Sequence, residues 1–218
     1  IKLTGNLDNQ VHIFGSVDKL NIIGKMHLWD GSCQKFLVDD IAGEYSFNAG
    51  ALILKGFKIK ALTTNVDLDG QMDSAGNLDF ALDARQIRLD RIPNLSNYAH
   101  VEGLVDFSGR IKGTSKEPLF AGSLTAKVIK INGEELTGIA FFVESKGGTI
   151  NKLNGNFAQG ADGTYEAVLL LDLGKGLLQG TLNVTNGDVK SIAKMAKEKI
   201  DVKGLLNGKI VINKDGKG

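Results

Sequence analysis

The chain has 218 residues, of which 42% are hydrophobic, so it carries enough apolar side chain for a packed fold and is unlike a disordered segment. Its net charge of +1 gives no bulk attraction to nucleic acid, and its one cysteine, Cys33, excludes an internal disulfide. It contains 28 glycines and only two prolines, a balance that favours tight turns and strand bends over a flexible linker.

Alternation of apolar and polar residues dominates the chain and predicts strands with one buried face. The segment 65–72, N-V-D-L-D-G-Q-M, alternates strictly, and the segment 78–84 does so again after the turn formers D-S-A-G-N, which predicts an antiparallel hairpin. The same pattern recurs later, in the segments 105–111, 165–173 and 178–184. Further turns are predicted at the dipeptides Asp30-Gly31, Asn132-Gly133 and Asp162-Gly163.

Two short helices are predicted between strands. Asp188 is a good N-cap, and apolar residues follow it at helical spacing, which predicts a helix over Asp188–Lys199. Pro93 is placed as the first-turn residue of a shorter helix, Asn94–Ala99.

The sequence repeats itself after about one hundred residues. V-E-G-L at 101–104 returns as V-K-G-L at 202–205, and other residues, such as Gly24 and Gly122, recur at nearly the same offset. Such a period indicates similar units that stack on one another. We therefore predict one repeat unit at 1–102, which is N-terminally incomplete, a second at 103–203, and the start of a truncated third at 204–218. The predicted fold is all-β, an elongated, curled antiparallel sheet that forms a β-taco or U-shaped hydrophobic groove, with one short helix per repeat.

No residue pattern indicates catalysis. The histidines His12, His27 and His100 lack metal-ligand spacing, and the aspartates around Gly70 depart from a calcium loop. Cys33 has no evident histidine partner, and the nucleotide-binding and nucleophile motifs do not occur. We expect a protein that is not an enzyme, with no catalytic residue, no metal ligand, no cofactor and no nucleic-acid partner.

The apolar faces of the predicted strands are the candidate functional site. In a closed sandwich they would form the core, whereas in an open sheet they would form a trough that needs a ligand. We predict that a lipid groove is lined by Val66, Leu68, Leu78, Phe80, Leu82, Val105, Phe107, Ile111, Ala167, Leu169, Leu171, Leu182 and Val184. The polar residues expected to face outward are Asp67, Asp69, Asp79, Asp83, Asp106 and Arg110.

The segment 89–126 carries a more specific pattern. A short helical stretch precedes V-x-G-x-[LV]-x-[FL]-x-G-x-[IL]-x-G-[ST], which is followed by P-x-x-x-G-x-[IL]. This pattern resembles the TamB/AsmA-like family of translocation and assembly module subunits, which are bridge-like lipid transfer repeat proteins. The resemblance is best over Ile87–Thr149, and this chain would be an internal fragment of such a protein.

The resemblance implies a function and a location. Members of the family are anchored in the inner membrane of diderm bacteria and span the periplasm, where an apolar β-groove carries phospholipid between the two membranes and supports outer-membrane biogenesis and protein assembly. The implied partners are phospholipid acyl chains, an outer-membrane barrel of the TamA type that binds regions outside this chain, and the inner membrane through an N-terminal anchor absent from it. The alternative is a structural or adhesive β-repeat segment of a surface protein, with a closed core and no lipid ligand.

Overall fold

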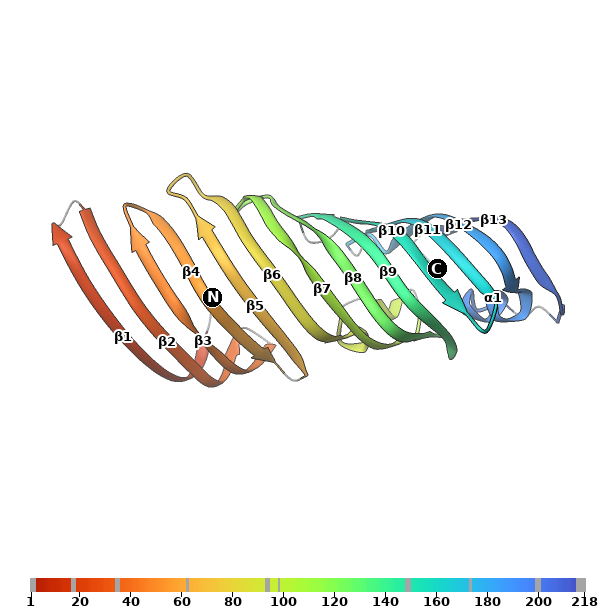
Figure 1. Cartoon of the computed structure of the whole chain (residues 1–218), viewed down its shortest axis with the longest axis horizontal. Coiled ribbons are helices and arrows are strands. Elements are labelled where there is room, and N and C mark those ends of the chain that lie inside the picture. Colours follow the sequence, from red (N-terminus) through yellow and green to blue (C-terminus); the bar gives the residue numbers. More distant parts are fainter. Residues whose placement is uncertain are drawn as a thin grey trace. The chain divides into compact units, whose positions relative to one another are not determined.

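A computed structural model describes residues 3–16, 19–33, 36–61, 63–92, 95–97, 99–147, 150–172, 174–198 and 201–214. Thirteen strands form a sheet in which the spatial order of the strands is their order in the sequence (Figure 1). The strands are β1 (Leu3–Ser16), β2 (Lys19–Cys33), β3 (Phe36–Asn48), β4 (Ala51–Ala61), β5 (Thr64–Met72), β6 (Asn77–Arg88), β7 (Val101–Thr114), β8 (Pro118–Ile131), β9 (Glu134–Lys146), β10 (Ile150–Gln159), β11 (Gly163–Asp172), β12 (Leu177–Asp188) and β13 (Leu205–Lys214). The prediction of an all-β antiparallel sheet is confirmed, and β1 and β13 are its edges.

Spatial contacts divide the chain into two compact units. Unit 1 comprises residues 1–87 and 107–119, and unit 2 comprises residues 88–106 and 120–218. These units are defined by contact, whereas the repeat boundaries 1–102, 103–203 and 204–218 are defined by sequence similarity and stay a prediction.

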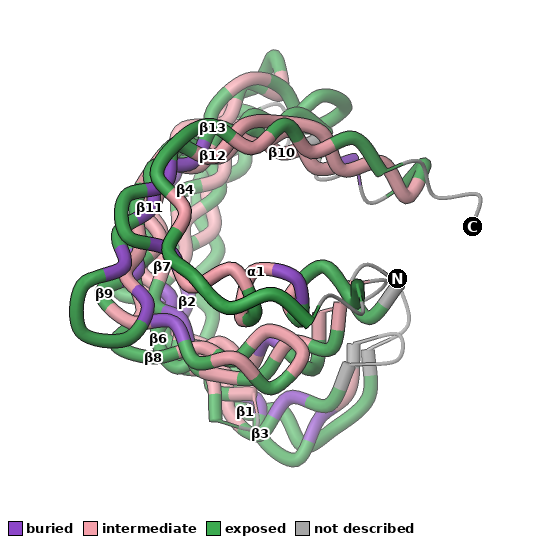
Figure 2. The backbone as a smooth tube through the Cα atoms, turned by 90° about the vertical axis from the view of Figure 1, so that its right-hand side faces the viewer, coloured by how far each residue is buried: buried purple, intermediate pink, exposed green. Residues whose placement is uncertain are grey.

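In unit 1, the predicted hairpin of β5 and β6 is confirmed. Val66 pairs with Ala84 and Leu68 pairs with Leu82, so the two apolar sets share one face. The carboxylate of Asp73 closes the turn by accepting hydrogen bonds from the backbone N–H groups of Ala75 (2.9 Å) and Asn77 (2.8 Å). Figure 2 shows how burial varies along the strands: buried or half-buried residues alternate with exposed ones.

In unit 2, the helix α1 (Val189–Met195) begins where the sequence predicts it, because Asp188 accepts a hydrogen bond from the backbone N–H of Ser191 (3.0 Å). The helix contacts both β12 and β9. Lys194 forms an ion pair with Glu134 (2.7 Å), and the amide of Asn132 donates to the carbonyl of Met195 (2.7 Å). The helix therefore bridges the two ends of the stretch of four strands from β9 to β12.

The predicted ends of the helices need correction. The helix α1 ends at Met195, four residues before the predicted Lys199, which lies outside the described residues. Within the predicted helix Asn94–Ala99, Leu95–Asn97 form the short 3-10 helix η2, and another 3-10 helix, η1 (Leu89–Arg91), precedes it. Pro93, Asn94 and Tyr98 lie outside the described residues. Between the end of β6 and the start of β7, the backbone forms hydrogen bonds from residue i+3 to residue i, for example from the Ile92 N–H to the Leu89 carbonyl.

One predicted turn is also wrong. Asp30-Gly31 lies inside β2, where Trp29 pairs with Asp40 and Gly31 with Val38. Asp30 does adopt the left-handed conformation that its dipeptide favours, with φ of 51°, but the pairing with β3 continues past it. By contrast, Asn132-Gly133 forms the predicted hairpin turn, with φ of 50° and 83°.

Candidate functional site

In unit 1, one face of the sheet consists of rows of apolar residues that pair across neighbouring strands. The first row is Leu7, Leu28, Ile41, Ile59, Val66 and Ala84. A second row is Ile13, Ile22, Phe47, Leu52, Met72 and Leu78. Between them runs the row Val11, Gly24, Tyr45, Leu54, Gly70 and Phe80. These three rows contain no charged residue, and we call this surface the apolar face.

Unit 2 has an apolar face of the same kind. One row is Val143, Leu153, Leu169, Gly180 and Ile212. The next row is Phe141, Gly155, Ala167, Leu182 and Ile210. Neither row contains a charged or hydrogen-bonding side chain, so each offers only apolar contacts.

The predicted lining residues are distributed over both units. Unit 1 holds Val66, Leu68, Leu78, Phe80, Leu82, Phe107 and Ile111, and unit 2 holds Val105, Ala167, Leu169, Leu171, Leu182 and Val184. Each of them is buried or half-buried. That the two sets line a single groove, and that the groove holds lipid, stay predictions.

Most of the apolar face is only half covered. Of the predicted lining residues, Phe80, Val105, Ala167 and Val184 are buried, while the others are half-buried. At the β1 edge, Leu7 is 57% exposed and Ile13 is 59% exposed. Apolar side chains that stay in contact with water on one face favour a ligand or a partner over a closed core.

Burial in unit 2 is concentrated where α1 packs. Leu136 and Tyr165 are each 1% exposed, and Ala193 of α1 is 5% exposed. The face therefore has a packed part near α1 and a more open part toward Leu169 and Leu171, which are half-buried.

Two glycines of the apolar face allow neighbouring strands to approach closely. Gly70 and Gly180 have φ of 145° and 156°, a region that residues with a side chain rarely adopt. A Cβ at Gly70 would collide with the Asp79 carbonyl, and a Cβ at Gly180 with that of Val168. Neither position tolerates a side chain without movement of the adjacent strand.

In unit 1, Asp67, Asp79 and Asp83 lie on the face opposite the apolar rows of β5 and β6. Asp67 pairs with Asp83 in register, one residue away from the apolar Val66 and Leu68. Lys58 forms an ion pair with Asp67 (2.8 Å), and Arg110 forms one with Asp79 (2.6 Å). The hydrogen bond from Lys58 lowers the pKa of Asp67 below its ordinary value. As predicted, these aspartates do not lie on the apolar face.

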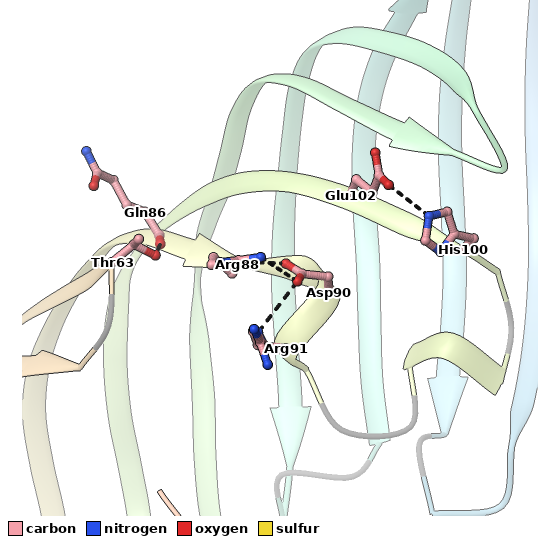
Figure 3. A network of polar contacts seen from close by, with 7 residues as sticks. All are labelled: Thr63, Gln86, Arg88, Asp90, Arg91, His100 and Glu102. Carbon is pink, nitrogen blue, oxygen red and sulfur yellow. Dashed lines mark hydrogen bonds and ion pairs between the residues drawn. The ribbon is translucent and has the colours of Figure 1, made fainter. Parts of the chain in front are cut away.

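Each unit also has local polar contacts, drawn in Figure 3. In unit 2, Arg88 donates two hydrogen bonds to Asp90 (3.1 and 2.7 Å), and His100 lies 2.8 Å from a carboxylate oxygen of Glu102. In unit 1, the Thr63 hydroxyl donates to the Gln86 carbonyl (3.2 Å). Arg88–Asp90 and His100–Glu102 join residues only two positions apart, so they fix local geometry without assembling a larger cluster.

Sequence reasoning missed three buried polar residues in unit 2, namely Ser145, Gln159 and Asp172. Gln159 is 8% exposed, and its Oε1 accepts a hydrogen bond from the Tyr165 hydroxyl (2.6 Å). Its Nε2 has no partner among the described residues, and neither does the Oγ of Ser145. Alternation placed Tyr165 on the apolar face, but no sequence signal links it to Gln159.

Within the described ranges, no three His, Cys, Asp or Glu side chains come together in a way that could hold a metal ion. None of the helices in the described part of the chain has the length and hydropathy needed to cross a membrane. The side chain of Cys33 lies outside the described residues.

Comparison with known proteins identifies no relative. No family model matches the chain, and neither a curated protein nor a solved structure does.

Proposed function

We propose that this chain is a segment of a TamB/AsmA-like lipid transfer protein and that its apolar face carries phospholipid acyl chains across the periplasm. The anchor in the inner membrane, the outer-membrane barrel partner of the TamA type and the role in outer-membrane biogenesis belong to the same proposal. They rest on the resemblance of the segment 89–126.

The observation that carries the proposal is the composition of the apolar face. Its rows contain no charged residue, and most of its side chains stay half exposed. Each acyl methylene that leaves water for such a surface contributes about 0.8 kcal/mol to binding. A mostly apolar lining without charged residues holds no position of the acyl chain much more tightly than the next, which suits sliding along the groove.

A phospholipid with a photoreactive acyl chain tests the proposal. We expect it to crosslink to the purified chain, and we expect Leu169→Asp to reduce crosslinking strongly. Because Leu169 is half-buried, the new carboxylate can stay hydrated, so the far-UV circular dichroism spectrum should be retained. Phe107→Asp should act in the same way in unit 1, where Phe107 is also half-buried.

The matched control is Val168→Asp. Val168 adjoins Leu169 in β11 but faces the other side and is 59% exposed, so crosslinking should be unchanged. No crosslinking of the unmodified chain, or equal crosslinking of Leu169→Asp and Val168→Asp, would refute the proposal. Global unfolding of Leu169→Asp would support the closed-core structural repeat instead.

A further inference from the structure

The polar face of unit 2 carries a hollow of about 510 Å³ over β10, β11 and β12. Its lining includes Asn154, Asn156, Glu166 and Asn183. These side chains point away from the apolar face, because they alternate with Leu153, Ala167 and Leu182 along their strands. The polar side chains of the hollow therefore lie on the face opposite the apolar rows, and the lining also includes Gly155 and Ala167 of those rows.

The polar side chains of the hollow form a row across the strands. Asn156 pairs with Glu166, Glu166 with Asn183, and Asn183 with Lys209 at the β13 edge. Neighbouring strands place these groups about 4.8 Å apart. The row thus presents hydrogen-bonding groups at a regular interval along a line perpendicular to the strands.

These groups are available to a ligand. Asn156, Glu166 and Asn183 are exposed, and within the described part of the chain their side chains form no hydrogen bond or ion pair. An amide offers both donors and an acceptor, and a carboxylate offers acceptors only. A ligand that follows the row must therefore carry donors and acceptors of its own at short intervals.

A second row beside the first is partly apolar. Phe142 and Val168 occupy it, 49% and 59% exposed, with Asn154 between them. Exposed rings and methyl groups next to hydrogen-bonding amides suit the faces of sugar rings and their N-acetyl methyl groups.

The charge of the hollow selects against charged polymers. Glu166 lies at the centre of the first row, and the nearest cation in that row, Lys209, is at its end. A nucleic acid or another polyanion would meet a carboxylate where it needs a basic patch. We propose that this hollow binds a neutral, N-acetylated oligosaccharide. A lone carboxylate cannot supply the two groups that glycoside cleavage requires, so the site binds the sugar without cleaving it.

Titration with chitohexaose, a neutral chain of N-acetylated sugars, tests the inference. In heteronuclear NMR spectra, we expect chemical-shift changes confined to β9–β12. Asn156→Ala and Asn183→Ala should each weaken binding about tenfold, the loss expected for one hydrogen bond. Glu166→Gln, which keeps the shape of the side chain, should weaken binding without lowering the melting temperature.

The matched control is Gln71→Ala, which removes an exposed amide from the polar face of β5 in unit 1 and should leave binding unchanged. Cellohexaose, which lacks the acetamido groups, should bind at least tenfold more weakly. The inference is overturned if chitohexaose does not bind, if the three hollow variants bind as well as the unmodified chain, or if cellohexaose binds equally. This test does not use lipid crosslinking, so the oligosaccharide inference can fail or succeed independently of the proposed function.

Discussion

Tyr165 and Gln159 form a buried polar pair whose removal should loosen β10–β12 measurably. The Tyr165 side chain is 1% exposed, and its hydroxyl donates to the Gln159 Oε1 at 2.6 Å. The Gln159 Nε2 already lacks a partner among the described residues. Tyr165→Phe would leave the Oε1 unpaired as well, in a site with little access to water.

The expected cost of Tyr165→Phe is about 1–3 kcal/mol, the usual penalty for a buried polar group left without its partner. The double variant Tyr165→Phe/Gln159→Leu removes both partners and should recover most of that loss, because two apolar side chains of similar size need no hydrogen bond. The non-additivity of the two changes measures the interaction itself.

Amide hydrogen exchange of β10–β12 is the assay, because it reports the opening free energy of these strands and not only that of the whole chain. A loss of 1–3 kcal/mol corresponds to exchange about 5- to 150-fold faster. Exchange in β2–β4 of unit 1 is the internal control and should not change.

The same pair predicts a pH dependence. Burial, and secondarily the charge of Asp188, raises the pKa of Tyr165 above its ordinary value of 10.0. The folded state therefore holds this proton more tightly, and the resulting stability is complete below pH 10 and lost as the pH rises through the folded pKa. Tyr165→Phe should show a weaker alkaline loss. Unchanged exchange in Tyr165→Phe, or a double variant as destabilised as the single one, would contradict the reasoning.

Two further changes test the bend and the helix contact. Gly180→Ala should destabilise β11–β12 by about 1–3 kcal/mol, because alanine disfavours φ of 156° and its Cβ meets the Val168 carbonyl, and exchange in those strands reports it. Equal protection in Gly180→Ala and the unmodified chain would refute the close approach. Glu134→Gln removes the ion pair with Lys194, whose hydrogen bond lowers the pKa of Glu134. Stability from a lowered pKa is present above the unfolded value near 4.5 and lost as the pH falls through the folded one, so urea denaturation should separate the two proteins at pH 7 and not at pH 3. The difference should stay below about 1 kcal/mol because Lys194 is 58% exposed, and a constant difference across this range would count against the ion pair.

Alternation was enough to predict β5 and β6 and the relative facing of their side chains. In β5 and β6 the period of two assigns Val66 and Leu68 to one face, and the turn residues between the strands set the register that pairs them with Ala84 and Leu82. Both signals are local, and an antiparallel hairpin needs no other information.

The contacts of α1 could not be predicted in the same way. The sequence marks its start at Asp188, but Glu134 and Asn132, which bind its residues Lys194 and Met195, lie about sixty residues earlier. The turn predicted at Asp30-Gly31 was wrong for the opposite reason. The local preference was correct, because Asp30 does have a positive φ, but the strand that contains it continues to pair with β3. The polar hollow was missed because Asn156, Glu166 and Asn183 come from three strands and form a row only once the register is known.

The strands lie in the sheet in the same order as in the sequence, and this has a consequence for how the protein is made. Each new strand needs only the strand before it in the chain as a template, so pairing can proceed from one end while the rest of the polypeptide is still emerging from a ribosome or a translocation channel. A nascent chain of this kind always presents one growing edge, and that edge is the surface that a chaperone would have to shield from other strands.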